Sequence, residues 1–324
     1  MATYKEIKGV KVVTKTSDPT ASEAAGTIWY NSTGDALKYA IEGAGTWAAG
    51  GNVNTANSYR CGAINATQTA GLVFGGHPTL TATEEYDGTS WTSVNNLTSG
   101  RAGPAGAGTQ TAGLCSSGTP YSPNSNAKTL NCESYNGTSW SEENNCLTGV
   151  SWMTGFGTQT AAMIAGGTTG HGVFIDNSQT WNGTSWTEGN NLLVATEGNA
   201  GTGTTTAGLS GAGLAPGTVL TCQTYDGTSW TEVNNMNSVH VYGGCFGTQT
   251  VALMCGSNNP PPSTGATETF DGTSWTETTN FTTARFGMGA MGTAASGLIA
   301  SGSASSATEE WTNPVYTIKT VTVS

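Results

Sequence analysis

The stretch Glu85-Tyr-Asp-Gly-Thr-Ser-Trp-Thr92 returns in nearly the same form four more times along the chain. An Asp-Gly or Asn-Gly pair between two β-prone runs is the strongest local signal for a hairpin, because both residues tolerate a positive φ angle. Each copy therefore predicts a hairpin with an aromatic residue on either side of its turn. The aromatic pairs are Tyr86 and Trp91, Tyr135 and Trp140, Trp181 and Trp186, Tyr225 and Trp230, and Phe270 and Trp275.

These hairpins recur at a regular spacing. The tryptophans that follow the turn in consecutive copies are 49, 46, 44 and 45 residues apart. A tight turn of the type Gly-Thr-Gln-Thr is a second marker, and its six copies begin at Ala66, Gly108, Gly157, Gly203, Gly247 and Gly292. A fixed period in this range marks stacked or radially arranged repeats. The two markers together indicate six units.

Each unit predicts four short strands, and the first strand is rich in small residues, as in Ala102-Gly-Pro-Ala-Gly-Ala107. This pattern favours an all-β fold, a six-bladed β-propeller with four-stranded blades. In a propeller the first strands crowd together at the axis, so only small side chains fit there. A linear solenoid of β-units is the competing interpretation, but the chain has no distinct capping repeats.

The two ends of the repeat region are incomplete in complementary ways. Trp47 precedes Trp91 by 44 residues and so marks a fourth strand without its first three, whereas the unit of Trp311 lacks a fourth strand. We expect the N-terminal strand to complete the last blade and close the ring. The expected domains are a short β-type N-terminal attachment arm at residues 1–44, the propeller at 45–312 and a C-terminal strand at 313–324.

The composition limits the class of partner. Only 10% of the 324 residues are charged, and the formal net charge is −11. Nucleic acid and anionic membranes require clustered Lys and Arg, so neither is expected as a partner. No apolar run approaches the ~18 residues of a membrane span, and the first residues lack the apolar core of a secretory signal. Half of the basic residues form either a solvated strand face or a dock for an acidic partner: Lys5, Lys8, Lys11, Lys15 and Lys38.

We find no motif for catalysis, a metal or a cofactor. His77, His171 and His240 fall in three different loops, without a carboxylate or cysteine at ligand spacing. The seven cysteines are odd in number and show no CxxC pair, so we predict reduced core residues. Each hairpin turn has one acidic or amide residue, a type that also binds metal ions. Residues on separate blades cannot converge on one ion, so we expect these residues only to stabilise their turns. They are Asp87, Asn136, Asn182, Asp226 and Asp271.

An apolar strand ending in Gly75-Gly76, followed by Tyr86 and Trp91, resembles the kelch repeat. The Tyr-Asp-Gly-Thr-Ser-Trp and Gly-Thr-Gln-Thr phrases, with the opening Met1-Ala-Thr-Tyr-Lys-Glu-Ile-Lys8, are similar to kelch-like structural proteins of marine tailed bacteriophages. The resemblance implies a kelch-like propeller that is assembled in the host cytoplasm and located in the virion, as a tail or neck fibre or appendage component. It also implies other virion proteins as partners of the N-terminal arm, and a homo-oligomer on the particle.

The two faces of the expected propeller differ in their sequences. The turns of one face repeat almost unchanged, whereas the loops of the other face vary, and recognition usually resides in loops held by a rigid scaffold. The variable face is therefore the expected binding face, although neutral loop variation explains the pattern as well. The candidate contacts are Tyr121, Trp152, His171, Phe174 and Tyr242.

Arginines offer a second candidate set. Arg60, Arg101 and Arg285 stand just before the first strand of their units, where they either bind acidic sugars near the axis or fix a loop by bonding its carbonyl groups. Taken together, the sequence predicts a virion protein, an adhesin that binds a host receptor or glycan and is not an enzyme. The alternatives are a glycan-degrading enzyme, since a catalytic set can assemble from several blades, and a purely architectural virion protein.

Overall fold

The computed structural model describes residues 12–19, 27–77, 81–120, 127–258, 262–313 and 316–321. These residues form β-strands, turns and loops, and none of them belongs to a helix that could cross a membrane. The chain divides into two compact units, one of Met1–Thr46 with Asn313–Ser324 and one of Trp47–Thr312. We call the second the propeller-like unit.

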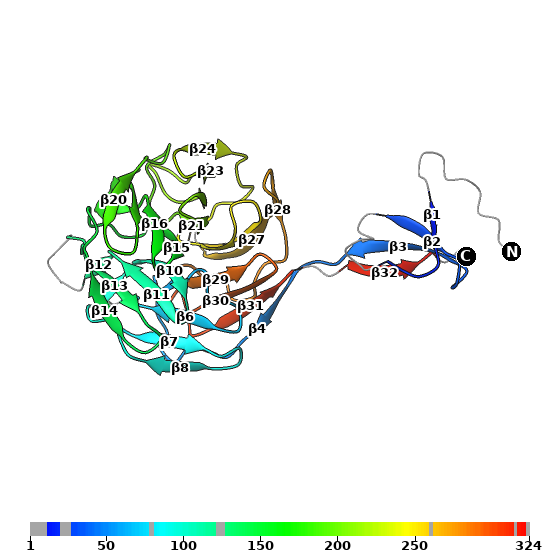
Figure 1. Cartoon of the computed structure of the whole chain (residues 1–324), viewed down its shortest axis with the longest axis horizontal. Coiled ribbons are helices and arrows are strands. Elements are labelled where there is room, and N and C mark those ends of the chain that lie inside the picture. Colours follow the sequence, from blue (N-terminus) through cyan, green and yellow to red (C-terminus); the bar gives the residue numbers. More distant parts are fainter. Residues whose placement is uncertain are drawn as a thin grey trace. The chain divides into compact units, whose positions relative to one another are not determined.

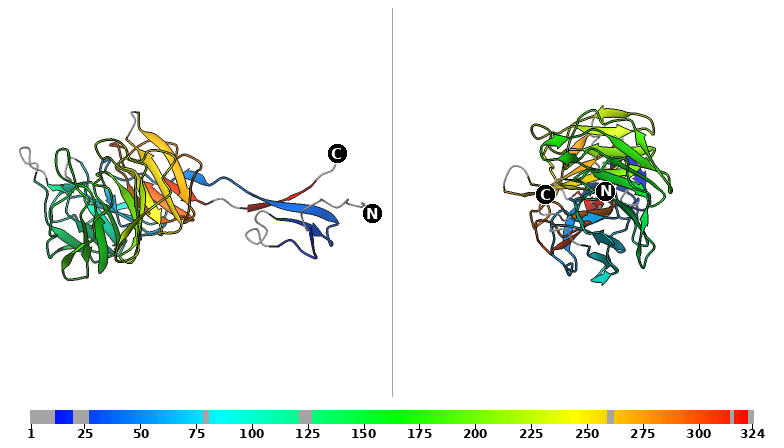
Figure 2. Two further views of the ribbon diagram at one scale, coloured as in Figure 1. Left: turned by 90° about the horizontal axis from the view of Figure 1, so that it is seen from above. Right: turned by 90° about the vertical axis from the view of Figure 1, so that its left-hand side faces the viewer.

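The smaller unit is built on one four-stranded sheet. Its strands, in spatial order, are β1 (Val13–Lys15), β2 (Ile28–Asn31), β3 (Ala36–Glu42) and β32 (Tyr316–Thr320). Strand β1 is parallel to β2, and the other pairs are antiparallel. Strand β32 lies beside β3 in Figure 1 and in the left view of Figure 2, so segments from the two halves of the chain's sequence share one sheet.

The propeller-like unit contains six four-stranded antiparallel sheets among its described residues. The first three sheets are β5 (Cys61–Gly62), β6 (Gly71–Phe74), β7 (Thr83–Tyr86), β8 (Trp91–Val94); β10 (Ala105–Thr109), β11 (Ala112–Ser116), β13 (Cys132–Tyr135), β14 (Trp140–Glu143); and β15 (Thr154–Thr158), β16 (Ala161–Ala165), β19 (Ser178–Trp181), β20 (Trp186–Gly189).

The other three sheets are β21 (Ala200–Thr204), β22 (Ala207–Gly211), β23 (Cys222–Tyr225), β24 (Trp230–Val233); β25 (Gly244–Gly247), β26 (Ala252–Ser257), β27 (Thr264–Phe270), β28 (Trp275–Glu277); and β29 (Gly289–Thr293), β30 (Ser296–Ala300), β31 (Thr308–Thr312), β4 (Thr46–Ala49). Two short pairs flank these sheets, β9 (Arg101–Ala102) with β12 (Thr119–Pro120), and β17 (Thr168–Gly170) with β18 (Val173–Phe174).

The sheets are arranged radially, with their first strands around the centre and their fourth strands on the circumference (Figure 1). First strands of consecutive sheets lie side by side, and β29 of the last sheet meets β5 of the first. Strand β4 supplies the fourth strand of the last sheet, where the Trp47 ring packs 5.3 Å from that of Trp311. This arrangement is that of a β-propeller-like fold.

Steric crowding explains the small residues of the first strands. A Cβ atom built on Gly155 would lie 2.6 Å from the Cβ of Ala105, and one on Gly106 would lie 2.3 Å from the carbonyl oxygen of Gly62. Real Cβ atoms do not approach other atoms this closely. Larger residues in these strands would therefore push neighbouring sheets apart.

The repeated aromatic hairpins join neighbouring sheets. In the first copy, the carboxylate of Asp87 accepts hydrogen bonds from two backbone N–H groups of its own turn, which confirms the turn interpretation. The Trp91 indole N–H donates to the hydroxyl of Thr308 in the preceding sheet (2.9 Å), and the Tyr86 hydroxyl donates to Glu310 (2.6 Å). These rings are buried, and an aromatic side chain removes roughly 150–250 Å² from water.

The Gly-Thr-Gln-Thr turns make an interaction that was not predicted from the sequence. The side-chain amide of Gln159 donates to the carbonyl oxygens of Gly113 (3.1 Å) and Tyr135 (2.6 Å), both in the preceding sheet. Gln68, Gln110 and Gln249 bond the preceding sheet in the same way. The recurring glutamine therefore fastens adjacent sheets to each other.

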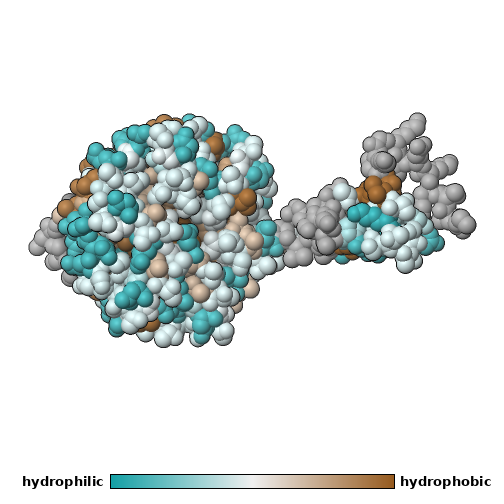
Figure 3. Space-filling model, viewed as in Figure 1, coloured by the Kyte–Doolittle hydropathy of each residue, from teal (hydrophilic) through white to brown (hydrophobic). Residues whose placement is uncertain are grey.

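The remaining surface and core features agree with the composition. All seven cysteines are free, and six of them are buried, as predicted. On the face visible in Figure 3, hydrophobic residues occupy small separate areas between polar ones. Among the described residues of this unit, the exposed large hydrophobic ones are Leu130, Leu147, Val173, Leu193 and Val251.

Replacing Gln159 by alanine should lower the free energy of unfolding by about 1–3 kcal/mol, because two inter-sheet hydrogen bonds are lost and two carbonyl groups lose their donor. Thr205→Ala is the matched control, since Thr205 occupies the same turn position in the fourth unit, and it should cost less than about 0.5 kcal/mol. Chemical denaturation measures both. Equal effects of the two substitutions would contradict the proposed fastening role.

Candidate axial binding site

Six equivalent residues surround the centre of the propeller-like unit, each just before the first strand of its sheet. All have positive φ angles between 53° and 66°, the left-handed region, and aromatic residues alternate with glycines around the ring. In chain order they are Tyr59, Gly103, Trp152, Gly198, Tyr242 and Gly287. We call this set the axial ring.

Backbone hydrogen bonds link the axial ring. The N–H of Trp152 donates to the carbonyl oxygen of Gly103 (2.9 Å), and the N–H of Gly198 donates to that of Trp152 (2.7 Å). The N–H groups of Gly103, Tyr242 and Gly287 donate in the same way, each to the carbonyl oxygen of the axial-ring residue before it. The N–H of Arg60, the residue after Tyr59, donates to the carbonyl oxygen of Gly287 (3.1 Å) and completes the ring of hydrogen bonds. The left-handed backbone thus gives each sheet a polar contact with the next one at the axis.

The alternation of aromatic residue and glycine has a steric cause. A Cβ atom on Gly103 would lie 2.3 Å from Cδ1 of Trp152, and one on Gly198 would lie 2.7 Å from Cδ1 of Tyr242. On Gly287 it would lie 2.7 Å from the backbone nitrogen of Tyr59. Each aromatic residue therefore covers the glycine before it in the ring, and six aromatic residues would not fit.

Four aromatic side chains gather at the axis, and we call them the axial rim: Tyr59, Trp152, Tyr242 and Phe286. The Tyr59 ring lies 5.8 Å from that of Trp152 and 5.3 Å from that of Tyr242, which is itself 6.0 Å from Trp152. Phe286 packs 5.6 Å from Tyr59. All four residues are half-buried.

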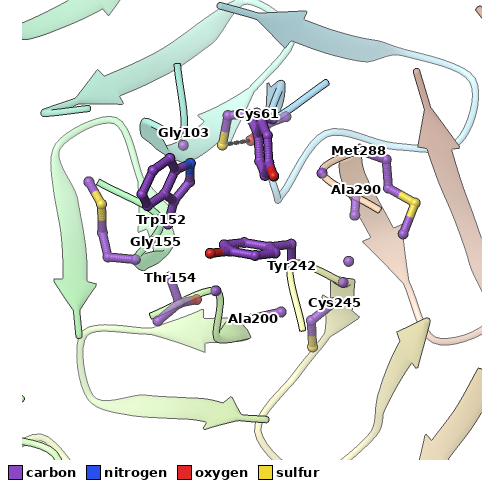
Figure 4. A pocket seen from close by; sticks show the side chains of 18 of the residues that line it. Cys61, Gly103, Trp152, Thr154, Gly155, Ala200, Tyr242, Cys245, Met288 and Ala290 are labelled. Carbon is purple, nitrogen blue, oxygen red and sulfur yellow. Dashed lines mark hydrogen bonds between the residues drawn. The ribbon is translucent and has the colours of Figure 1, made fainter. Parts of the chain in front are cut away.

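A cavity of about 110 Å³ adjoins the rim, and Trp152 and Tyr242 face it together with the small residues of the first strands (Figure 4). Its other walls include Gly62, Gly106 and Gly155. An apolar cavity of about 150 Å³ is enough for benzene, so this space suits a small substituent rather than a whole sugar ring.

Two charged groups stand beside the rim. The Tyr242 hydroxyl donates a hydrogen bond to Oε1 of Glu197 (2.9 Å), and the Nζ atom of Lys128 lies 5.0 Å from the centre of the Trp152 ring. Burial, and then the charge of Glu197, raise the pKa of Tyr242 above its ordinary value. Tyr242 therefore remains a neutral donor to Glu197 and is poorly suited to act as a nucleophile.

The structure brings together two of the residues proposed from sequence, Trp152 and Tyr242. His171 and Phe174 lie on the separate hairpin of β17 and β18 and do not line the cavity. Tyr121 lies outside the described residues. The described residues contain no group of three His, Cys, Asp or Glu side chains that could hold a metal ion.

The interpretation of Arg101 and Arg285 as sugar contacts is wrong, because both side chains are fully buried. Arg285 pairs with Glu309 (2.7 Å) and donates to the carbonyl oxygens of Thr283 and Ser301. Arg101 pairs with Glu133 and likewise bonds carbonyl groups. The alternative role, fixing a loop through its carbonyl groups, is the one observed.

These ion pairs belong to a repeated loop anchor. In each third strand, the residue two positions before the strand's aromatic residue is a carboxylate or an amide. It accepts backbone N–H groups from the loop leading into its own sheet, as Glu309 does from Thr282 (2.8 Å). Each carboxylate at this position pairs with an arginine or histidine of the same loop. Where the loop has no basic residue, the position is occupied by an amide, Gln179 or Gln223. The anchored loops carry the axial ring.

Four residues at this site were not predicted from the sequence: Tyr59, Phe286, Glu197 and Lys128. For Tyr59 a signal was present, since axial-ring residues stand five positions before the Gly-Thr turn in five units and seven before it in the first. No repeat marks Glu197 or Lys128, because both lie in connections that differ from one unit to the next.

Among solved structures, the chain is similar to one described as "Structure of YjhT", with a TM-score of 0.67 and 13% sequence identity over 83% of this chain and 99% of that chain. At this identity the likeness shows the fold alone. No protein-family model matches the sequence, and neither does any curated protein.

Arg101→Val should lower the free energy of unfolding by about 3–5 kcal/mol, because Glu133 would remain buried without its partner. The double variant Arg101→Val/Glu133→Gln reproduces the Val150 and Gln179 combination of the third sheet. It should recover most of the loss in a denaturation experiment. A double variant as unstable as the single one would show that the anchor does not work as described.

Proposed function

We propose that this chain is a structural protein of a tailed-bacteriophage virion, a tail or neck fibre or appendage component that binds a glycan or receptor on the host surface. In this proposal the six sheets are the blades of a closed, kelch-like propeller. The smaller unit attaches to other virion proteins, and the protein forms a homo-oligomer on the particle. Peptides of this chain should then be found by mass spectrometry of purified particles.

The observation that carries the binding role is the axial rim. Three aromatic side chains from alternate positions of the axial ring converge beside a cavity, and each is half-buried. Aromatic faces with a polar tip are well suited to contact the C–H face of a sugar while bonding its hydroxyl groups. A concave apolar site with a few convergent polar groups is the usual form of a small-ligand site.

The rigidity of the site supports the same role. The axial ring is tied together by backbone hydrogen bonds, and the loops that carry it are anchored by buried carboxylates and amides. A ligand would therefore meet side chains that are already in place. Binding to such a preorganised site loses less free energy to ordering than binding to mobile loops.

Full-length protein should bind at least one member of a panel of immobilised bacterial surface polysaccharides. Trp152→Gly should weaken that binding more than about tenfold, as expected for an aromatic residue that the ligand covers. Glycine occupies three positions of the axial ring, so this substitution keeps the backbone conformation. His171→Ala, on another hairpin, is the matched control. The proposal fails if Trp152→Gly binds as well as the parent protein, or if no polysaccharide binds.

A further inference from the structure

The propeller-like unit has a very uneven set of charges. Residues 47–312 contain four basic and sixteen acidic residues, a formal charge of −12. Three of the four basic residues, Arg60, Arg101 and Arg285, are buried in ion pairs with glutamates. Lys128 is the only lysine in this part of the chain, and it lies on the axial rim.

Two contacts hold the Lys128 ammonium group in place. It lies 5.0 Å from the centre of the Trp152 ring and donates a hydrogen bond to the hydroxyl of Thr119 (3.2 Å). Burial lowers the pKa of Lys128, and the negative charge of Glu197 opposes that shift. Glu197 also accepts a hydrogen bond from the Tyr242 hydroxyl. The same carboxylate therefore bonds to the aromatic rim and attracts the lysine ammonium electrostatically.

We propose that the axial rim recognises an ammonium group on the ligand, and that Lys128 occupies the place of this group when no ligand is bound. The inference rests on the proposed role of the rim as the binding site. The ligand class is a glycan or glycan substituent that carries a primary ammonium, as in an amino sugar, or a quaternary ammonium, as in choline.

Electrostatics favours a cation over an anion at this site. Aromatic faces attract cations through the quadrupole of the ring, and cages of aromatic residues are the established means of binding ammonium ligands. Glu197 adds a full negative charge next to the rim, and the field of a unit with charge −12 draws cations and repels anions. A single lysine cannot reverse that balance.

Lys128 is a weak occupant that a ligand can replace. A cation–π contact at a partly exposed site shifts an equilibrium by only about twofold to fivefold. Lysine also gains rotamer freedom when its side chain is released into water. A ligand ammonium that contacts Trp152 and Glu197 together, with its carbon skeleton against the other rings, makes more contacts than the lysine does.

The test is isothermal titration of the full-length protein with glucosamine and choline, and with glucose and N-acetylglucosamine as neutral probes. The two cationic probes separate a primary from a quaternary ammonium preference. Lys128→Gln removes the internal competitor and should tighten binding of the preferred cation about threefold to tenfold. Lys15→Gln, an exposed lysine of the smaller unit, is the matched control and should change nothing.

Glu197→Gln keeps an acceptor for the Tyr242 hydroxyl but removes the charge, so it should weaken binding of the cation while leaving the fold intact. The inference is overturned if Lys128→Gln leaves binding of the cations unchanged or weaker, or if the neutral probes bind as tightly as the cations. Trp152-dependent binding of neutral probes alone would overturn the inference but leave the proposed glycan-binding function standing. Absence of binding to every probe and polysaccharide would overturn both.

Discussion

Steric crowding at the axis is the constraint on which the rest of this structure depends. The first strands of the six sheets lie side by side around the centre, and at several positions no atom larger than hydrogen fits in place of a Cβ. Glycine therefore occupies these positions, and the larger side chains of the same strands, Phe156, Phe246 and Met291, are buried against glycines of the neighbouring sheets. The large aromatic rings of the hairpins sit between sheets, where space widens with distance from the axis.

Small residues near the axis bury little apolar surface, so hydrogen bonds between neighbouring sheets contribute to holding the sheets together. Glutamine amides from the turns, the axial-ring backbone and the indole N–H groups of Trp91, Trp140 and Trp230 all donate hydrogen bonds to a neighbouring sheet. Each satisfies a polar group that would otherwise be buried without a partner, which is where hydrogen bonds matter most to stability. Few of these contacts involve charges, in agreement with a chain in which only 10% of residues are charged.

Much of the fold could be predicted from the sequence, because each repeat marks the same turns and strands. The Asp-Gly hairpins, the small first strands, the free cysteines and the pairing of Trp47 with the last sheet were all predictable from spacing and turn chemistry. A repeat gives positions but not side-chain directions. The arginines were therefore misplaced as ligand contacts, since only the structure shows that they turn inward to buried glutamates.

The candidate site was predictable only in part for the same reason. Trp152 and Tyr242 stood out as aromatic residues in variable loops, but their partner Tyr59 was hidden by a two-residue difference in spacing, and Lys128 follows no repeat. The most direct measurement is a crystal structure of the full-length protein with glucosamine or choline. We predict the ligand ammonium on the face of Trp152 beside Glu197, with Lys128 displaced. A ligand bound elsewhere, or Lys128 still resting on Trp152, would contradict the account.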